Sequence, residues 1–64
     1  MCESHVYLLK DGVQKMIMED VVFIRPQGEQ LYLQNLLGNE QTVDAKISEI
    51  RFMEHKIILE PTTR

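Results

Sequence analysis

The stretch that decides the fold class is residues 26–39, which read PQGEQLYLQNLLGN. Its middle alternates apolar and polar side chains, with Leu31 and Leu33 on one parity and Tyr32 and Gln34 on the other. A period of two is that of a β-strand with one face in a core. A Pro-Gln-Gly turn signal precedes the alternation and Gly-Asn follows it, because proline presets φ and glycine accepts left-handed backbone. We therefore predict a strand that points Leu31 and Leu33 inward.

Apolar runs of similar length fill the chain on both sides of this strand. Asp11-Gly12 is a hairpin turn signal, Glu19-Asp20 is a polar break, and Glu54-His55 separates the last two runs. The three-residue spacing of Ile47 and Ile50 predicts one helical turn. The predicted extended runs are 3–9, 13–18, 21–25, 30–35, 40–44, 50–53 and 56–60.

These runs make about six short strands, with turn signals roughly every 8–12 residues, a pattern typical of a small barrel or sandwich. Closing the sheet into a barrel would remove its exposed edges. An antiparallel sheet whose open edge pairs with a second subunit is the alternative. We therefore predict a single all-β domain over residues 1–64, built as a small six-stranded antiparallel barrel.

The length of 64 residues makes the core of a single chain marginal. A chain of this size buries only about 60% of the surface that its unfolded form exposes. Small domains usually add disulfides, a metal or a partner subunit. Cys2 is the only cysteine, so no disulfide can form within the chain. We therefore expect a metal, a homo-oligomer, or both.

Composition and charge exclude several classes of protein. The formal net charge is −3 and the seven basic residues are scattered singly, which argues against a nucleic-acid binder. No apolar run is long enough for a membrane span or a signal peptide, and the one thiol suits a reducing compartment. The sequence has no serine elbow, no phosphate loop and no His-x-x-x-His pair. We expect a cytoplasmic protein that is not an enzyme.

Cys2 is the residue that suggests metal chemistry. Methionine aminopeptidases remove Met1 when the second side chain is small, which would leave an α-amine beside the thiol. Amine and thiolate together form a five-membered chelate on a transition metal. If Met1 stays, its amine, the Cys2 amide nitrogen and the thiolate offer an alternative chelate. In both versions the donors must lose protons, so binding should release them.

One such chelate supplies two donors, whereas a stable site needs about four. A twofold homodimer supplies the second copy by symmetry. Two amines and two thiolates in a plane suit square-planar Ni(II) or Cu(II), whereas zinc prefers a tetrahedron. Copper in the cytosol is largely Cu(I), which favours fewer and softer ligands. The chemistry therefore indicates one Ni(II) per homodimer.

Other side chains are weaker candidates. Glu3 is either a further candidate ligand or a solvated carboxylate. His5 is either an alternative ligand, a residue that holds a ligand in place, or an imidazole on the strand surface. His55 fits a solvated turn. Three methionines suggest either a soft-metal site or, as we prefer, core or dimer packing: Met16, Met18 and Met53. Four aromatic residues suggest base stacking or, as we prefer, core packing: Tyr7, Tyr32, Phe23 and Phe52.

The opening nine residues, MCESHVYLL, resemble the CooT family, as do the chain length, a glycine turn after the third strand and the final Ile-Ile-Leu strand. Members of this family are small nickel-binding proteins linked to maturation of carbon monoxide dehydrogenase. The resemblance implies a barrel of Sm- or SH3-like type and a homodimer with one Ni(II) held through Cys2. It also implies a nickel enzyme or its maturation machinery as partner. An RNA- or protein-binding small barrel is the alternative function, and a structural dimerisation module is a third.

Overall fold

The first two strands form a hairpin at the predicted turn. The computed structural model describes residues 3–62. Strand β1 (Ser4–Lys10) and strand β2 (Val13–Gln27) pair antiparallel across Asp11-Gly12. Both turn residues have positive φ, 54° and 78°, which glycine adopts freely and aspartate tolerates. The turn signal in the sequence is therefore confirmed.

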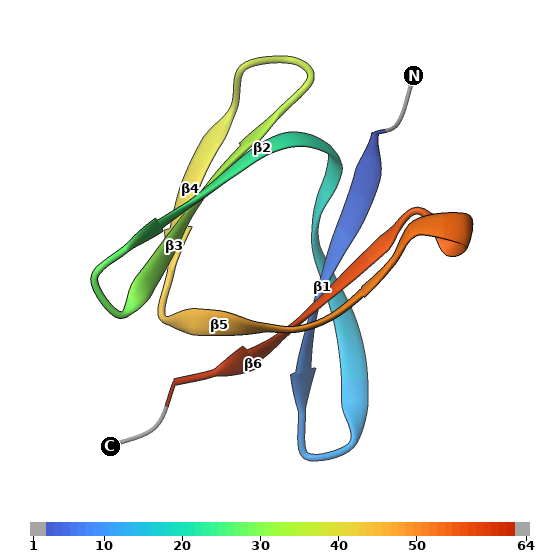
Figure 1. The fold of residues 1–64 in the computed structure, drawn as a ribbon, viewed down its shortest axis with the longest axis vertical. Coiled ribbons are helices and arrows are strands. Elements are labelled where there is room, and N and C mark those ends of the chain that lie inside the picture. Colours follow the sequence, from blue (N-terminus) through green and yellow to red (C-terminus); the bar gives the residue numbers. More distant parts are fainter. Residues whose placement is uncertain (1–2, 63–64) are drawn as a thin grey trace.

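The remaining elements complete a single curled sheet (Figure 1). They are β3 (Gln30–Asn35), β4 (Glu40–Val43), β5 (Ala45–Arg51), the short 3-10 turn η1 (Phe52–Glu54) and β6 (Lys56–Pro61). The strand order is β4-β3-β2-β1-β6-β5. Within residues 3–62, no helix has the length and apolar character needed to cross a membrane. The all-β prediction is confirmed.

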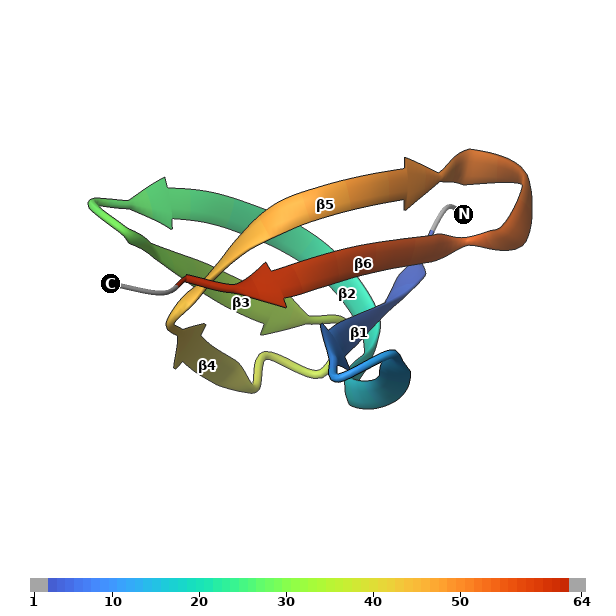
Figure 2. The ribbon, with the colours of Figure 1, turned by 90° about the horizontal axis from the view of Figure 1, so that it is seen from below.

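The prediction that the sheet is antiparallel throughout is wrong, because β1 and β6 run parallel. Tyr7 lies opposite Ile58 and Leu8 opposite Leu59 in this ladder. A parallel pair needs a long crossover, which the intervening strands β2 to β5 provide. The sheet is therefore mixed, and it curls into a half-barrel in which β4 and β5 are the two edges (Figure 2).

The predicted break at Glu19-Asp20 is a bend inside one continuous strand of 15 residues. The register with β1 shifts between the pairs Ser4–Val21 and Val6–Met18, and Asp20 there has a φ of 52°. Such bulges bend a strand and increase its twist. The bend lets the first part of β2 pair with β1 and its last part pair with β3.

The helical turn predicted at residues 47–50 is also wrong, since these residues belong to β5. In the ladder with β6, Ile47 faces Leu59 but Glu49 faces Ile58, so Ser48 is an extra residue. A bulge shifts the alternation by one position. It places Ile47 and Ile50 on the same face of the sheet, which accounts for their helix-like spacing.

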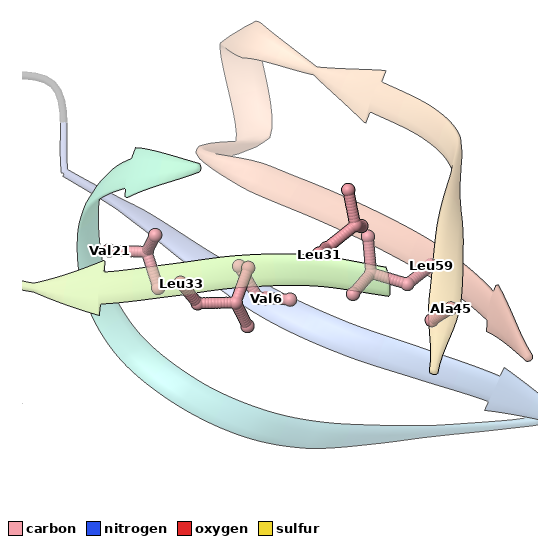
Figure 3. Close-up of a cluster of buried hydrophobic side chains, with 6 residues drawn as sticks. All are labelled: Val6, Val21, Leu31, Leu33, Ala45 and Leu59. Carbon is pink, nitrogen blue, oxygen red and sulfur yellow. The ribbon is translucent and has the colours of Figure 1, made fainter. Parts of the chain in front are cut away.

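The core lies inside the curl of the sheet and is aliphatic. Leu31 and Leu33 belong to it, as the alternation predicts, and Leu33 is completely buried. The cluster in Figure 3 consists of Val6, Val21, Leu31, Leu33, Ala45 and Leu59. Among the described residues, ten large hydrophobic side chains remain exposed against seven buried hydrophobic ones. The single chain therefore leaves much apolar surface uncovered.

Candidate functional site

Cys2 precedes β1 by two residues in the sequence. The surroundings of the candidate site are therefore those of the end of the sheet where β1 begins. Cys2 itself lies outside the described residues 3–62. Glu3 is half-buried and directly precedes β1. Because β1 lies between β2 and β6, its start has the bend of β2 on one side and the η1 end of the β5–β6 hairpin on the other (Figure 1).

Three hydrogen bonds tie four segments together at this end. The backbone N–H of His5 donates to the carbonyl of His55 at 2.9 Å. The backbone N–H of Asp20 donates to Nδ1 of His5 at 3.3 Å. The N–H of Leu36 donates to the carbonyl of Asp20 at 2.8 Å. The start of β1 is therefore fixed to the β2 bend, to the β3–β4 turn and to the residue after η1.

The described residues do not form a metal site by themselves. Within residues 3–62, no group of three or more His, Cys, Asp or Glu side chains is placed to hold a metal ion. Of the candidates from the sequence, Glu3 and His5 lie close along the chain at the start of β1, whereas His55 is exposed and meets His5 through its backbone.

Exposed apolar side chains occur in three segments near this end, on either side of the start of β1, and we call them together the N-terminal rim. Phe52 and Met53, in η1, are 80% and 94% exposed. Val22 and Leu36 flank the β2 bend. The rim comprises Val22, Leu36, Leu37, Ile50, Phe52 and Met53, six of the ten large exposed hydrophobic residues. Sequence reasoning missed this set, because its members come from three separate segments of the chain, residues 22, 36–37 and 50–53.

The methionines have different environments. Met18 packs against the core, which confirms the packing interpretation for that residue. Met16 is 40% exposed, and Met53 belongs to the rim. For Met53, packing in the core of its own chain is contradicted by its exposure.

The aromatic side chains lie outside the core, so the core-packing interpretation for them is wrong. Phe23 and Tyr32 make an edge-to-face pair at 5.9 Å, and the Arg25 guanidinium lies over both rings, 5.6 and 5.0 Å from their centroids. Desolvation, and then the Glu40 carboxylate, raise the pKa of the Tyr32 hydroxyl. The nearby carboxylate disfavours a phosphate backbone on this face.

An open groove lies elsewhere in the described chain, at the end with the β1–β2 turn. It has a volume of about 730 Å³. Its charged lining residues are Lys10, Asp11, Glu29, Lys46 and Glu60. Neither His nor Cys lines it, so the candidate site and the groove are separate.

The fold defines a small all-β module built from one mixed, curled sheet. A model of the family described as CO dehydrogenase accessory protein CooT matches residues 1–60, and the chain belongs to the CooT family. The crystal structure of a protein from Carboxydothermus hydrogenoformans, assigned as CooT, superposes with a TM-score of 0.91 at 27% identity. That match covers 97% of this chain and all of the other.

A comparison with functionally curated proteins finds no match. The family match confirms the resemblance seen in the sequence, and it makes the protein an accessory protein of CO dehydrogenase and not an enzyme.

Proposed function

We propose that this protein is a cytoplasmic Ni(II)-binding accessory protein of CO dehydrogenase maturation, which holds one Ni(II) per homodimer through Cys2. The observation that carries the proposal is the position of Cys2, two residues ahead of a central strand whose start is fixed by hydrogen bonds. The family to which the chain belongs serves an enzyme whose chemistry needs nickel. The CO dehydrogenase maturation machinery is then the partner that receives the metal.

The amine–thiolate donor set supports nickel and favours a site shared by two chains. Residues 3–62 of one chain contain no cluster of three ligating side chains. The donors that we propose are therefore the Cys2 thiolate and a neighbouring main-chain nitrogen. Two symmetry-related copies of this pair make a planar N₂S₂ set, which suits Ni(II) better than tetrahedral zinc. The Cys2 residues would bind the metal, and the two β1 strands would orient them.

The N-terminal rim supports the homodimer. Two Cys2 residues can share one ion only if the ends of the sheet that carry them face each other. The rim lies at that end and is apolar, as the centre of a homodimer interface usually is. A stable interface removes roughly 800 Å² from each partner. The chain exposes 4672 Å² in total, so such an interface would cover a modest part of its surface.

A double substitution in the rim tests the dimer. In Phe52→Glu/Met53→Glu, two exposed side chains become charged, so the fold of the single chain should persist. Four carboxylates would then meet across the twofold axis, and we expect the dimer to dissociate at least a hundredfold more readily. Analytical ultracentrifugation without nickel measures this. Val13→Glu, a 65% exposed position beside the β1–β2 turn, is the matched control and should leave the dimer intact.

Native mass spectrometry of the untagged protein with added nickel tests the function itself. We expect a dimer that carries one Ni(II), because two copies of the amine–thiolate chelate complete a set of four donors. The same spectrum reports whether Met1 has been removed. A monomer that retains one Ni(II), or a dimer that remains metal-free with excess nickel, would contradict the proposal.

A further inference from the structure

The bulge in β2 turns one backbone amide toward a side chain of β1. Between the pairs Ser4–Val21 and Val6–Met18, β1 contains only His5, whereas β2 contains both Glu19 and Asp20. The additional residue of a bulge falls outside the regular ladder. The N–H of Asp20 donates to Nδ1 of His5, 3.3 Å away. The imidazole thus takes the place of a main-chain acceptor.

We infer that His5 is a positioning residue, which fixes how the chain ahead of β1 leaves the sheet, and that it is not a ligand of the metal. The inference rests on the proposed function, since it concerns how Cys2 is presented to nickel. His5 is fixed twice: its side chain accepts from Asp20, and its backbone N–H donates to His55. The carbonyl of Asp20 is in turn occupied by Leu36.

The direction of the Asp20 hydrogen bond argues against metal binding by the imidazole. A nitrogen that accepts a hydrogen bond has no proton, so the proton of neutral His5 is on Nε2. A metal-bound histidine normally donates its other ring N–H to an acceptor. At His5 that geometry is reversed. Binding through Nδ1 would use the lone pair that Asp20 occupies, and binding through Nε2 would place two N–H donors face to face.

Holding the start of β1 should strengthen nickel binding without any contact to the metal. A donor group that is already held near its bound position loses less conformational freedom when it binds. Cys2 is three residues ahead of His5, so the two hydrogen bonds of His5 fix the part of β1 to which the N-terminal residues are joined. Loss of the Asp20 bond should therefore weaken nickel binding while leaving the metal-ligand spectrum unchanged.

Three substitutions at position 5 of the untagged full chain separate positioning from ligation. In His5→Asn, Oδ1 replaces Nδ1 as an acceptor at the same distance from the backbone. His5→Gln keeps a polar group only at the position of Nε2, and His5→Ala keeps neither. We expect His5→Asn to bind nickel within about twofold of the unchanged protein. The Gln and Ala variants should bind roughly fivefold more weakly, the equivalent of one lost hydrogen bond.

The exchange rate of the Asp20 amide proton, measured by NMR, reads the hydrogen bond directly. It should remain slow in His5→Asn and become faster in His5→Gln and His5→Ala. His55→Asn is the matched control, because asparagine tolerates the left-handed φ of 54° at that position and the His55 side chain is exposed. This control should change neither nickel binding nor Asp20 exchange.

Two results would overturn the inference. If His5→Asn loses nickel while Asp20 remains protected, His5 is a ligand. If His5→Ala leaves both Asp20 exchange and nickel affinity unchanged, the hydrogen bond positions nothing. Failure of the proposed function gives a different pattern. Replacing Cys2 would then leave nickel affinity unchanged, whereas substitutions at His5 would still change the exchange rate of the Asp20 amide proton.

Discussion

Replacing Cys2 by serine should abolish tight Ni(II) binding. A serine hydroxyl remains protonated under conditions in which a thiol gives up its proton to a metal. Serine is also small, so removal of Met1 should proceed as before and the α-amine should be preserved. The measurement is a nickel titration that follows the Ni–thiolate charge-transfer absorption. We expect that band to vanish, and the urea unfolding transition of the metal-free protein to stay the same.

A relocated thiol provides the control. In Cys2→Ser/Ser48→Cys the chain again has one cysteine, now at an exposed position in β5. If any accessible thiol were enough, nickel binding would return. We expect no return, because the thiol would be separated from the terminal amine. Charge-transfer absorption that survives in the Cys2→Ser protein would rule out the thiolate as ligand.

Replacing Leu33 by alanine should remove a large part of the stability. Leu33 is completely buried in the core cluster, and a buried Leu→Ala change costs about 2–5 kcal/mol. A chain of this length has a free energy of unfolding of only about 3–10 kcal/mol. Urea denaturation at one fixed protein concentration, without metal, should show a much lower midpoint. Val13→Ala, at an exposed position, should change the free energy of unfolding by less than about 0.5 kcal/mol.

Local signals predicted much of the strand pattern. The alternation around Leu31 and Leu33 predicted an inward-facing pair, and both are in the core. The turn at Asp11-Gly12 was also predicted correctly, because residues two apart or adjacent determine such features. Phe52 and Met53, predicted to be extended, form part of the 3-10 turn η1. The two other local errors have one cause. At Asp20 and at Ser48 a bulge inserts an extra residue, and a bulge looks like a break or a helical spacing in a one-dimensional pattern.

The parallel pairing of β1 with β6 and the contacts of His5 could not be predicted from local patterns. His5 and Asp20 are 15 residues apart, and their hydrogen bond depends on the register of β1 against a bulged strand. The N-terminal rim likewise combines residues from three separate regions of the chain. Cys2 was singled out by its chemistry and its position in the sequence, which need no fold. Its role remains a prediction for the nickel titrations to test.

The parallel contact between β1 and β6 has a consequence during protein synthesis. β1 (Ser4–Lys10) is made early, but its neighbour β6 (Lys56–Pro61) follows about 50 residues later. At roughly 5–20 residues per second, the ribosome needs several seconds for that interval. Throughout it, β1 has at most one of its two neighbouring strands. The half-barrel can therefore close around β1 only after β6 has been made, late in synthesis.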